Sequence, residues 1–544
     1  MKELVVLDIE VLPNYFLIAF KKLSDGKLLK VDMFGSLSKL NRKQKSQINH
    51  IMKTYTTFGY NSINYDMPVL NYALDGASCE KIYSLSCKII EKRMPSWMVY
   101  RDLEITERAY NHFDISEPSP AVMISLKNYG TRIGSKKLQE FYLDPHEPIS
   151  RAEIIPLSSY CVNDLDVTID LYNAIKKRID LRISMSEEYG LDLRSKSDAQ
   201  IAEAVICSEL DKVGVKAMKP NVVQKPRYKA PDYVTFDDPA LNELVHELED
   251  TRFELAANGA VKLPKELSNR KIVIGDTKYK LGIGGLHSQE KKLSVVSDEK
   301  NVMRNADFTS YYPFIIILQK LAPKHLGKKF LGIYEKIVHT RLKAKAEGNK
   351  LVADSLKITI NGSFGKFGSK YSKLYSPDLL LATTITGQLT LLMVIEQLEL
   401  NGIPVVSANT DGLEYYCPRD KVDLAEAIIC DLELLTGYEM EHGEYKALHA
   451  RDVNNYVAVY DGEVKAKGVY AETTLSKGRS TPIVFEAIRE YLGKGTPIER
   501  TIHDCDDINE FVSARTVKGG AVWCGEYLGK MVRWYYSTNG ASIH

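Results

Sequence analysis

Several features of common protein classes are scarce or missing in this 544-residue chain. Its eight cysteines are scattered without a Cys-x-x-Cys pair, which argues against a disulfide framework or a zinc ribbon and favours reduced thiols. No uninterrupted apolar run reaches the ~20 residues of a membrane span, and Met1-Lys2-Glu3-Leu4 is not typical of a signal peptide. We therefore expect a cytoplasmic protein with no membrane partner.

A strong charge of either sign is also missing, since the formal net charge is only +1. Any basic surface that binds nucleic acid must therefore be local. Internal repeats and low-complexity tracts are absent from the sequence. What remains is typical of a soluble globular protein, with 44% hydrophobic and 26% charged residues, and its length predicts three or four domains.

Two acidic residues interrupt the first apolar run, Leu4 to Leu12. Asp8 and Glu10 stand two residues apart, so on a β-strand their side chains share one face. Two carboxylates that point the same way repel each other unless a cation lies between them. Taken alone, the run can also be interpreted as an edge strand that faces solvent.

Further acids follow in the first third of the chain. Asn61 and Asp66 lie in a polar segment after Gly59, and Tyr160 and Asp164 open an amphipathic helix. On a helix Tyr160 and Asp164 lie one turn apart on one face. There a tyrosine hydroxyl can orient a water molecule while the carboxylate holds a metal. For Asn61 the alternative is an ordinary turn residue beside a glycine.

The order Asp-x-Glu, Asn-xxx-Tyr-Asp, Tyr-xxx-Asp resembles the three motifs of the DnaQ-like 3′→5′ exonucleases. That family has an RNase H-like fold, a mixed sheet flanked by helices. The resemblance implies that Tyr160 positions water and that Asn61 contacts a frayed primer end. It implies four metal ligands: Asp8, Glu10, Asp66 and Asp164. Asp166 is the competing choice for the last ligand, although the helical spacing from Tyr160 favours Asp164.

The second half of the chain contains two more acids in strand-like surroundings. Asp307 precedes Phe308-Thr309-Ser310-Tyr311-Tyr312-Pro313, and an Asp at a strand end before such a turn presents its carboxylate and the next carbonyl to a cation. The alternative is an aromatic-rich turn. Residues 404–415 predict a β-hairpin whose tip presents Asp411.

Between these acids the sequence predicts two antiparallel helices, Gly332 to Glu347 and a second from about Lys350, joined by Gly348-Asn349. Arg341 and Lys345 lie one turn apart on the first. On the second, one face carries Lys357, Asn361 and Gly365. Such cations can clamp a triphosphate, and a glycine allows close approach of a base. The alternative is solvated charge on an exposed helical hairpin.

Taken in order, Asp-x-x-Ser-x-Tyr-Pro, Lys-x-x-x-Asn-x-x-Phe-Gly and Asn-Thr-Asp-Gly resemble the three polymerase motifs of family B DNA polymerases. The resemblance implies a right-hand polymerase with palm, fingers and thumb. It implies that Asp307, Asp411 and the Phe308 carbonyl hold two metal ions, and that Tyr312 rejects a 2′-hydroxyl. The other implied nucleotide-binding residues are Ser310, Tyr311, Arg341, Lys345, Lys357, Asn361 and Gly365.

The chain departs from the family pattern at several positions. Asn409 replaces the usual first Asp of the last motif, and Gly362 stands where Ser is common. The usual Lys-x-Tyr motif lacks its lysine: Asn454-Asn455-Tyr456 occupies the expected place, and Arg451, Lys465 and Lys467 are the candidate substitutes for the lysine. Gly284 and Gly285 belong to a loop that resembles a template-binding Tyr-x-Gly-Gly loop without its Tyr.

We also expect a strip that follows DNA phosphates after the fingers, formed by Lys366 and Lys370 together with Lys373 and Tyr371. With Asn61, Gly284, Gly285, Tyr456 and Lys467, Lys366 and Lys370 complete the predicted DNA-binding residues.

The motif positions predict α/β and α+β domains along the chain. We expect an exonuclease domain at 1–180, connecting helices and the first part of the palm at 181–300, palm at 301–330, fingers at 331–366, palm at 367–470 and thumb at 471–544. The short stretch from Asp307 to Lys357 leaves no room for the insertion of protein-primed phage enzymes. A compact bacteriophage replicative type fits best, with the host cytoplasm as its location.

The resemblance thus predicts a DNA-directed DNA polymerase with 3′→5′ proofreading. We expect two Mg²⁺ per site, with Mn²⁺ as the alternative, a monomer, and primer–template DNA, single-stranded DNA, dNTPs and replisome proteins as partners. Three other interpretations stay open: a nuclease whose second half only binds DNA, a non-catalytic replication scaffold, and a protein-primed initiator.

Overall fold

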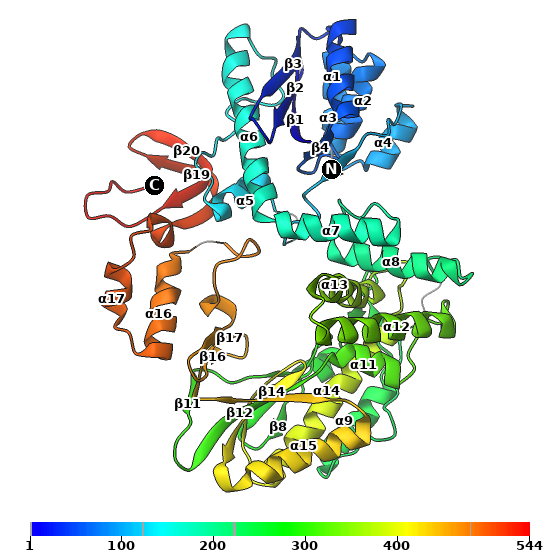
Figure 1. The fold of residues 1–544 in the computed structure, drawn as a ribbon, viewed down its shortest axis with the longest axis vertical. Coiled ribbons are helices and arrows are strands. Elements are labelled where there is room, and N and C mark those ends of the chain that lie inside the picture. Colours follow the sequence, from blue (N-terminus) through cyan, green and yellow to red (C-terminus); the bar gives the residue numbers. More distant parts are fainter. Residues whose placement is uncertain (1–2, 122–123, 221–224, 479) are drawn as a thin grey trace. The chain divides into compact units, whose positions relative to one another are not determined.

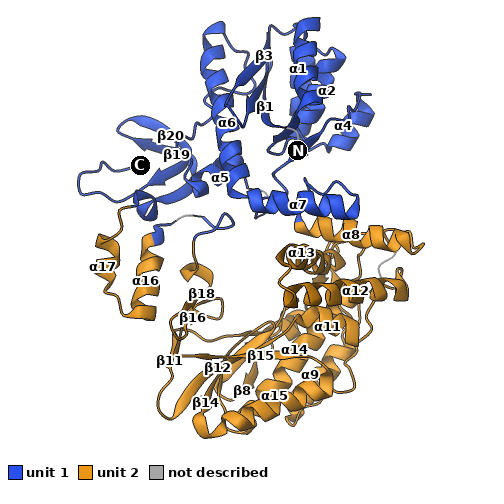
Figure 2. Cartoon of the chain, in the orientation of Figure 1, with its two compact units in different colours: residues 1–197, 473–482, 507–544 blue, residues 198–472, 483–506 orange. Residues whose placement is uncertain are grey.

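The computed structural model describes residues 3–121, 124–220, 225–478 and 480–544. The chain forms two compact units, coloured separately in Figure 2. Unit 1 comprises Met1–Ser197, Thr473–Pro482 and Asp507–His544, and unit 2 comprises Asp198–Glu472 and Ile483–Asp506. The expected mixed α/β multidomain architecture is confirmed. The six finer domain boundaries stay a prediction, because two units are too coarse a division to test them.

Unit 1 is built around a five-stranded mixed sheet with the strand order β3-β2-β1-β4-β5 (Figure 1). The strand β1 pairs antiparallel with β2 and parallel with β4. It is therefore the central strand, and the edge-strand interpretation of the first apolar run is wrong. The strands are β1 (Leu4–Leu12), β2 (Tyr15–Lys22), β3 (Leu28–Phe34), β4 (Thr56–Gly59) and β5 (His112–Asp114).

Helices cover both faces of this sheet, because residues of β1 alternate between two hydrophobic clusters. Val5 and Ile9 pack with α1, α2 and α3, whereas Val6 packs with α6 on the other face. Asp8 and Glu10 share the face of Val6 and point to the side of α6. The helices are α1 (Arg42–Thr54), α2 (Asp66–Asp75), α3 (Cys79–Ile90), α4 (Ser96–Asp102), α5 (Leu126–Ile133), α6 (Ile154–Ala174) and α7 (Lys176–Tyr189).

Two late strands also belong to unit 1. The hairpin of β19 (Ser513–Trp523) and β20 (Glu526–Trp534) contacts α5. These residues lie in the segment predicted as a thumb, and that assignment stays a prediction.

Unit 2 contains a seven-stranded antiparallel sheet with the order β15-β12-β14-β13-β10-β9-β8. The predicted hairpin is confirmed, since β13 and β14 pair antiparallel on either side of Thr410 and Asp411. The strands are β8 (Ile272–Ile274), β9 (Thr277–Lys280), β10 (His287–Ser288), β12 (Asn301–Phe308), β13 (Val405–Asn409), β14 (Gly412–Pro418) and β15 (Met440–Tyr445). A smaller sheet joins β11 (Leu293–Val296), β16 (Ala447–Asp452), β17 (Asn455–Val459) and β18 (Val464–Ala466).

The two predicted helices between the acids are present as α12 (Gly327–Ala346) and α13 (Lys350–Phe367), which pack together. The first begins earlier than expected. Asn349 caps the second with its side chain, which accepts from the Val352 amide, so the turn prediction is confirmed. The other main helices are α8 (Asp198–Lys212), α9 (Pro239–Asp250), α11 (Tyr311–Leu318), α14 (Pro377–Leu400), α15 (Val422–Thr436), α16 (Pro482–Lys494) and α17 (Ile498–His503).

Helix α14 is long and apolar enough to cross a membrane, with a mean hydropathy of 1.6 over its most apolar window. In the structure 83% of that window is buried. Gln388 lies in the middle of the helix, where it exchanges hydrogen bonds with the Gly282 amide and carbonyl at 2.9 and 2.8 Å. Helix α14 is therefore the core helix of unit 2, and it packs against strands β8, β13 and β14 of the sheet.

Candidate active sites

The predicted acids of the first third converge in unit 1. Asp8 and Glu10 project from β1, Asp66 is the first residue of α2, and Asp164 lies on α6. Ligand atoms of Asp8, Glu10 and Cys161 lie within 4.8 Å of one another. The Cys161 thiol donates to Asp8 Oδ2 at 3.5 Å. The structure thus brings together carboxylates from a strand and two helices.

Burial raises the pKa of all four carboxylates, and repulsion from other members of the set adds to the rise at Asp8, Glu10 and Asp66. Burial, with the charge of Asp164, raises the pKa of Asp8 to about 7, and burial raises the pKa of Glu10 and Asp66 well above their usual range. The Asp66 Oδ1 atom is buried without a hydrogen-bond partner among the described residues. Carboxylates gathered in this way fit a divalent cation, which would replace the lost hydration and offset their repulsion.

Lys127 on α5 belongs to this site and was missed from the sequence. Its ammonium forms an ion pair with Asp164 and lies 4.3 Å from the centre of the Tyr160 ring. Its charge lowers the pKa of Asp164, which burial otherwise raises. The side chains of Lys127 and Asp164 are only 16% and 12% exposed, so the pair is largely shielded from solvent. A single lysine on a short amphipathic helix gives no sequence signal of such a contact.

Asp166, the competing choice for the last ligand, lies elsewhere. Its side chain is 48% exposed and forms an ion pair with Lys21 at the end of β2. The charge of Asp164, in contrast, contributes to the raised pKa of both Asp8 and Glu10. The geometry therefore favours Asp164 as the member of this site.

Asn61 lies in a turn whose backbone amides donate to the Asp114 carboxylate. The Asn61 backbone is left-handed, with φ 55°, and its amide donates to Asp114 Oδ1 at 2.9 Å. The Ile63 amide donates to the other oxygen at 3.0 Å. The Asn61 carboxamide oxygen accepts from Asn64 at 3.1 Å. The turn interpretation thus accounts for its backbone, and its predicted DNA contact stays a prediction.

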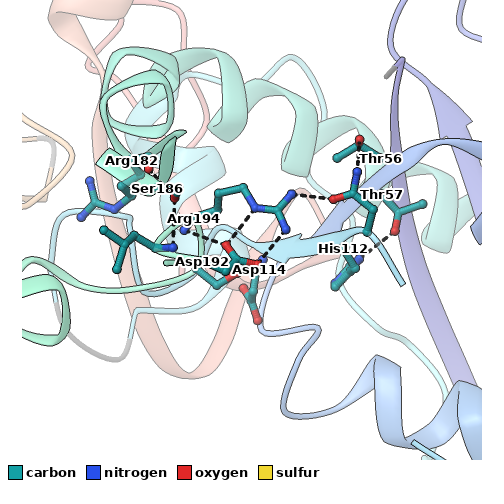
Figure 3. A network of polar contacts seen from close by, with 11 residues as sticks. Thr56, Thr57, His112, Asp114, Arg182, Ser186, Asp192 and Arg194 are labelled. Atoms are coloured by element: carbon teal, nitrogen blue, oxygen red, sulfur yellow. Dashed lines mark hydrogen bonds and ion pairs between the residues drawn. The ribbon is translucent and has the colours of Figure 1, made fainter. Parts of the chain in front are cut away.

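A polar network continues beneath this turn (Figure 3). His112 bonds to Thr57 at 3.0 Å. It also bonds to Ser62 at 2.8 Å, and burial lowers its pKa to about 3, so its ring is neutral. Arg194 grips Asp192 with two hydrogen bonds, at 2.9 and 2.7 Å. Arg194 Nη1 also donates to Asn111 Oδ1 at 2.7 Å, and the Asp114 amide donates to Ser195 Oγ at 2.8 Å. These two bonds join the segment after α7 to strand β5 and the residue before it.

Unit 2 brings Asp307 and Asp411 together at the end of β12. Asp307 lies opposite Gly412 in the β12–β14 pair, and the Phe308 amide donates to the Asp411 carbonyl at 2.7 Å. A Cβ atom added to Gly412 would lie 1.8 Å from Asp307 Oδ1. The absence of a side chain at residue 412 therefore creates the space in which the Asp307 carboxylate lies.

Both carboxylates reach solvent but are partly desolvated by the protein around them. Burial raises the pKa of each, and the charge of Asp307 raises that of Asp411 further. Asn305 Nδ2 donates to Asp307 Oδ2 at 2.8 Å, and the charge of Lys467 lowers the pKa of both acids. Two neighbouring carboxylates that remain open on one side fit divalent cations with oxygen ligands.

A pocket of about 320 Å³ opens beside Asp411. Tyr312 stacks on Phe364 with ring centres 4.9 Å apart, and its hydroxyl donates to the Gly284 carbonyl at 2.6 Å. Arg341 Nη1 donates to Ser310 Oγ at 3.1 Å. The lining residues are Ser310, Tyr311, Tyr312, Pro313, Tyr334, Arg341, Ile360, Asn361, Phe364, Thr410 and Asp411.

Three other predicted nucleotide-binding residues are not among the described residues that line the pocket. Lys345 forms a 3.7 Å ion pair with Glu441, the residue opposite Asp307 on β15. Lys357 and Gly365 are exposed on α13, on the same helix as Asn361. Their predicted contacts with a nucleotide stay a prediction.

The predicted DNA-binding residues of unit 2 fall into two groups, whereas Asn61 belongs to unit 1. A Cβ added to Gly285 would lie 2.8 Å from Thr410 Oγ1, so the Gly284–Gly285 loop lies against the hairpin tip. The Lys467 amide donates to the Tyr456 carbonyl at 2.8 Å. Burial raises the pKa of Tyr456, and the charges of Asp307 and Asp411 add to that rise. The charge of Lys467 lowers the pKa of both acids. This first group therefore lies near the hairpin tip and the two carboxylates.

Lys366 and Lys370 instead have partners within unit 2. Lys366 forms a 2.9 Å ion pair with Glu203, and Lys370 donates to the Ala257 carbonyl. A phosphate would therefore have to compete with these contacts.

Two departures from the family pattern have structural reasons. Asn409 Nδ2 donates to the Val453 carbonyl and Asn454 Oδ1 at 3.4 and 3.3 Å, so its amide ties the hairpin to the β16–β17 turn. An Asp in its place could not donate these bonds. A Cβ added to Gly362 would lie 2.4 Å from the Asp198 carbonyl, so close packing of α13 on α8 requires glycine there.

Comparisons with known proteins give partial matches. No family model matches the chain. "DNA polymerase 1" of Sulfolobus acidocaldarius is 27% identical over 175 residues, 31% of this chain and 18% of that protein. The Sulfurisphaera ohwakuensis protein of the same name is 28% identical over 162 residues, 29% of this chain and 17% of that protein. The chain is thus similar to archaeal DNA polymerases over a limited region, which spans less than a fifth of their length.

A solved structure, the family B DNA polymerase from the hyperthermophilic archaeon Pyrobaculum calidifontis, aligns with a TM-score of 0.44 and 15% sequence identity. The alignment covers 96% of this chain and 68% of that chain.

Proposed function

We propose that this protein is a template-directed DNA polymerase of the family B type that extends a primer 3′-hydroxyl with dNTPs and proofreads with a 3′→5′ exonuclease. One observation carries the polymerase assignment. Asp307 and Asp411, distant in sequence, meet beside a pocket that also presents Tyr312, Arg341 and Asn361. An acidic pair beside a cationic and aromatic pocket is the arrangement that nucleotidyl transfer requires.

In the polymerase site, Asp307, Asp411 and the Phe308 carbonyl would hold two Mg²⁺ ions, or Mn²⁺. When bound, such ions lower the pKa of the primer hydroxyl and stabilise the charge of the leaving pyrophosphate. Arg341 would bind the triphosphate, with Lys345 and Lys357 further along the same helical pair. Tyr312, fixed by Phe364 and the Gly284 carbonyl, would lie under the sugar and exclude a 2′-hydroxyl.

In the exonuclease site, Asp8, Glu10, Asp66 and Asp164 would hold the ions. Tyr160 would orient the attacking water. Lys127, which pairs with Asp164 and lies over the Tyr160 ring, would offset part of the rise that burial causes in the pKa of Asp164. Asp66 and Asp164 are buried and Asp8 and Glu10 are partly buried, and repulsion between such carboxylates is unfavourable without a cation, which supports this assignment. Asn61 would contact the frayed primer end.

The remaining finer assignments belong to this proposal. They are an RNase H-like exonuclease domain beside a right-hand polymerase, a compact bacteriophage replicative type in the host cytoplasm, and a monomer. Its partners would be primer–template DNA, single-stranded DNA, dNTPs and replisome proteins. The Tyr456–Lys467 pair next to the carboxylates supports a primer-strand contact at that place.

The test measures primer extension and primer degradation on the same labelled primer–template. Asp411→Ala should reduce dNTP incorporation by at least about 1,000-fold and leave degradation without dNTPs unchanged, because only one set of ligands is lost. Asp8→Ala should do the reverse. Asp420→Ala and Asp166→Ala, which remove exposed or half-exposed acids of the two units, are the matched controls.

Three outcomes would contradict the proposal. Loss of both activities from either substitution in a folded protein would rule out two separate sites. Degradation of primers at high dNTP concentration with no extension would indicate a nuclease. Attachment of dNMP to a partner protein without a primer would indicate a protein-primed initiator.

A further inference from the structure

A second group of metal-ligand side chains lies in unit 1, outside the carboxylate site. Cys87 lies on α3, Glu91 directly follows that helix, and His146 lies in the segment between α5 and α6. Ligand atoms of the three residues lie within 4.8 Å of one another. They are the thiol of Cys87, a carboxylate oxygen of Glu91 and a ring nitrogen of His146.

The helix places two of these ligands on one face. The Glu91 amide donates to the Cys87 carbonyl at 2.9 Å and its backbone is helical, so Cys87 and Glu91 are related as i and i+4. Tyr83 lies one turn before Cys87 on the same face. The Tyr83 hydroxyl bonds to His146 Nδ1 at 2.9 Å. Its hydrogen bond with Cys87 is the main cause that raises the pKa of Tyr83 to about 12, and burial contributes less.

A turn presents the third ligand. The His146 amide donates to Asp144 Oδ1 at 2.9 Å, and the Glu147 amide donates to the Asp144 carbonyl at 3.2 Å. His146 Nδ1 then lies 3.9 Å from Glu91 Oε1. The imidazole nitrogen therefore already faces both the carboxylate and the hydroxyl of the helix.

We propose that Cys87, Glu91 and His146 bind one Zn²⁺ at the surface of unit 1, with water as the fourth ligand. One sulfur, one nitrogen and one oxygen donor match the preference of Zn²⁺ for four mixed ligands, whereas Mg²⁺ prefers oxygen ligands alone. Tyr83 gives up its hydrogen bond to His146 when the metal binds. The three ligand atoms already lie within 4.8 Å of one another, and Glu91 and His146 are exposed, so side-chain rotations can bring them around one ion.

The metal links two elements that are otherwise joined at this place by exposed contacts. The segment that carries His146 leads into α6, which presents Tyr160 and Asp164. Bound Zn²⁺ therefore fixes the approach to α6 against α3 and stabilises unit 1.

The test uses the full chain, stripped of metal with a chelator and then titrated with Co²⁺ or Zn²⁺ in excess Mg²⁺. Co²⁺ should produce a sulfur-to-cobalt charge-transfer band. One equivalent of Zn²⁺ should displace the Co²⁺ and remove the band. Cys87→Ser should abolish the band. His146→Gln should weaken Zn²⁺ binding by at least about 100-fold, because loss of a residue that only supports a ligand already costs up to about 100-fold in affinity. Cys430→Ser, which removes an exposed cysteine elsewhere, is the matched control.

Zn²⁺ should also protect Cys87 from a thiol reagent and raise the unfolding temperature of the unsubstituted chain but not of Cys87→Ser. The proposal is wrong if Cys87→Ser retains the band and the affinity of the parent. It is also wrong if Cys161→Ser alone removes them, because the ion would then lie at the Asp8–Glu10 site.

Discussion

At the scale of single residues, Gly412 controls the position of the Asp307 carboxylate. A Cβ at this position would lie 1.8 Å from Asp307 Oδ1, so any side chain must displace the carboxylate. Misplacing a catalytic group by about 1 Å costs on the order of 100-fold in rate. We therefore expect Gly412→Ala to reduce single-turnover dNTP incorporation by about 100-fold while the exonuclease rate stays the same.

Gly332→Ala is the matched control, because Gly332 lies within α12 and a Cβ there meets open space among the described residues. It should leave incorporation unchanged and stabilise the helix by roughly 1 kcal/mol. If Gly412→Ala incorporated dNTPs at the rate of the unsubstituted chain, Asp307 would not need its observed position.

Lys127 gives a second prediction at this scale, which concerns pH. Its charge lowers the pKa of Asp164, so its removal lets burial raise that pKa further. A higher pKa means that a higher pH is needed to ionise the carboxylate. We expect Lys127→Met to slow single-strand degradation at neutral pH and to move the acidic limb of its pH–rate profile to higher pH, with dNTP incorporation unchanged.

Lys21→Met is the control, since Lys21 forms the corresponding ion pair with the half-exposed Asp166. Lys21→Met should have the same pH–rate profile of single-strand degradation as the unsubstituted chain. Lys127→Arg should retain part of the activity that Lys127→Met loses. A shifted profile in Lys21→Met but not in Lys127→Met would identify Asp166 as the ligand.

At the scale of elements, the contact of α13 with α8 depends on one glycine. A Cβ on Gly362 would lie 2.4 Å from the Asp198 carbonyl and 2.9 Å from Ala202 Cβ. Gly362→Ser, which restores the residue common in the family pattern, should therefore separate the helices and lower the free energy of unfolding. Overpacking of this kind costs about 1–3 kcal/mol, and chemical denaturation would measure it.

Gly365→Ala, one turn later on α13, tests the same helix without the contact, because its Cβ meets open space among the described residues. It should be neutral or slightly stabilising, since alanine has the higher helix propensity. If Gly362→Ser were as stable as Gly365→Ala, α8 could move without cost.

Local patterns were sufficient to predict most of the elements that present the acids. The i and i+2 spacing of Asp8 and Glu10 predicted one strand face, which β1 confirms. The amphipathic pattern after Tyr160 predicted a helix, which α6 confirms, although α6 begins earlier, at Ile154. Lys127 escaped prediction because its ion pair depends on how α5 packs on α6, which no sequence spacing encodes. The central position of β1 depends likewise on its pairing with β4.

At the scale of the whole molecule, each compact unit has its own hydrophobic interior. In unit 1, two clusters cover the two faces of the five-stranded sheet, and Leu165 of α6 is fully buried in one of them. In unit 2, one large cluster surrounds α14, where Leu392 is fully buried. Units with separate interiors are expected to unfold as separate cooperative transitions.

We therefore expect differential scanning calorimetry of the full chain to resolve two transitions that respond to different substitutions. Leu165→Ala should lower one and Leu392→Ala the other, each by several degrees, because a buried Leu→Ala change costs about 2–5 kcal/mol. The untouched transition in each variant is the internal control. A single transition that both substitutions lower equally would mean that the two units unfold as one, and the separation of the two proposed activities would then need support from the active-site variants alone.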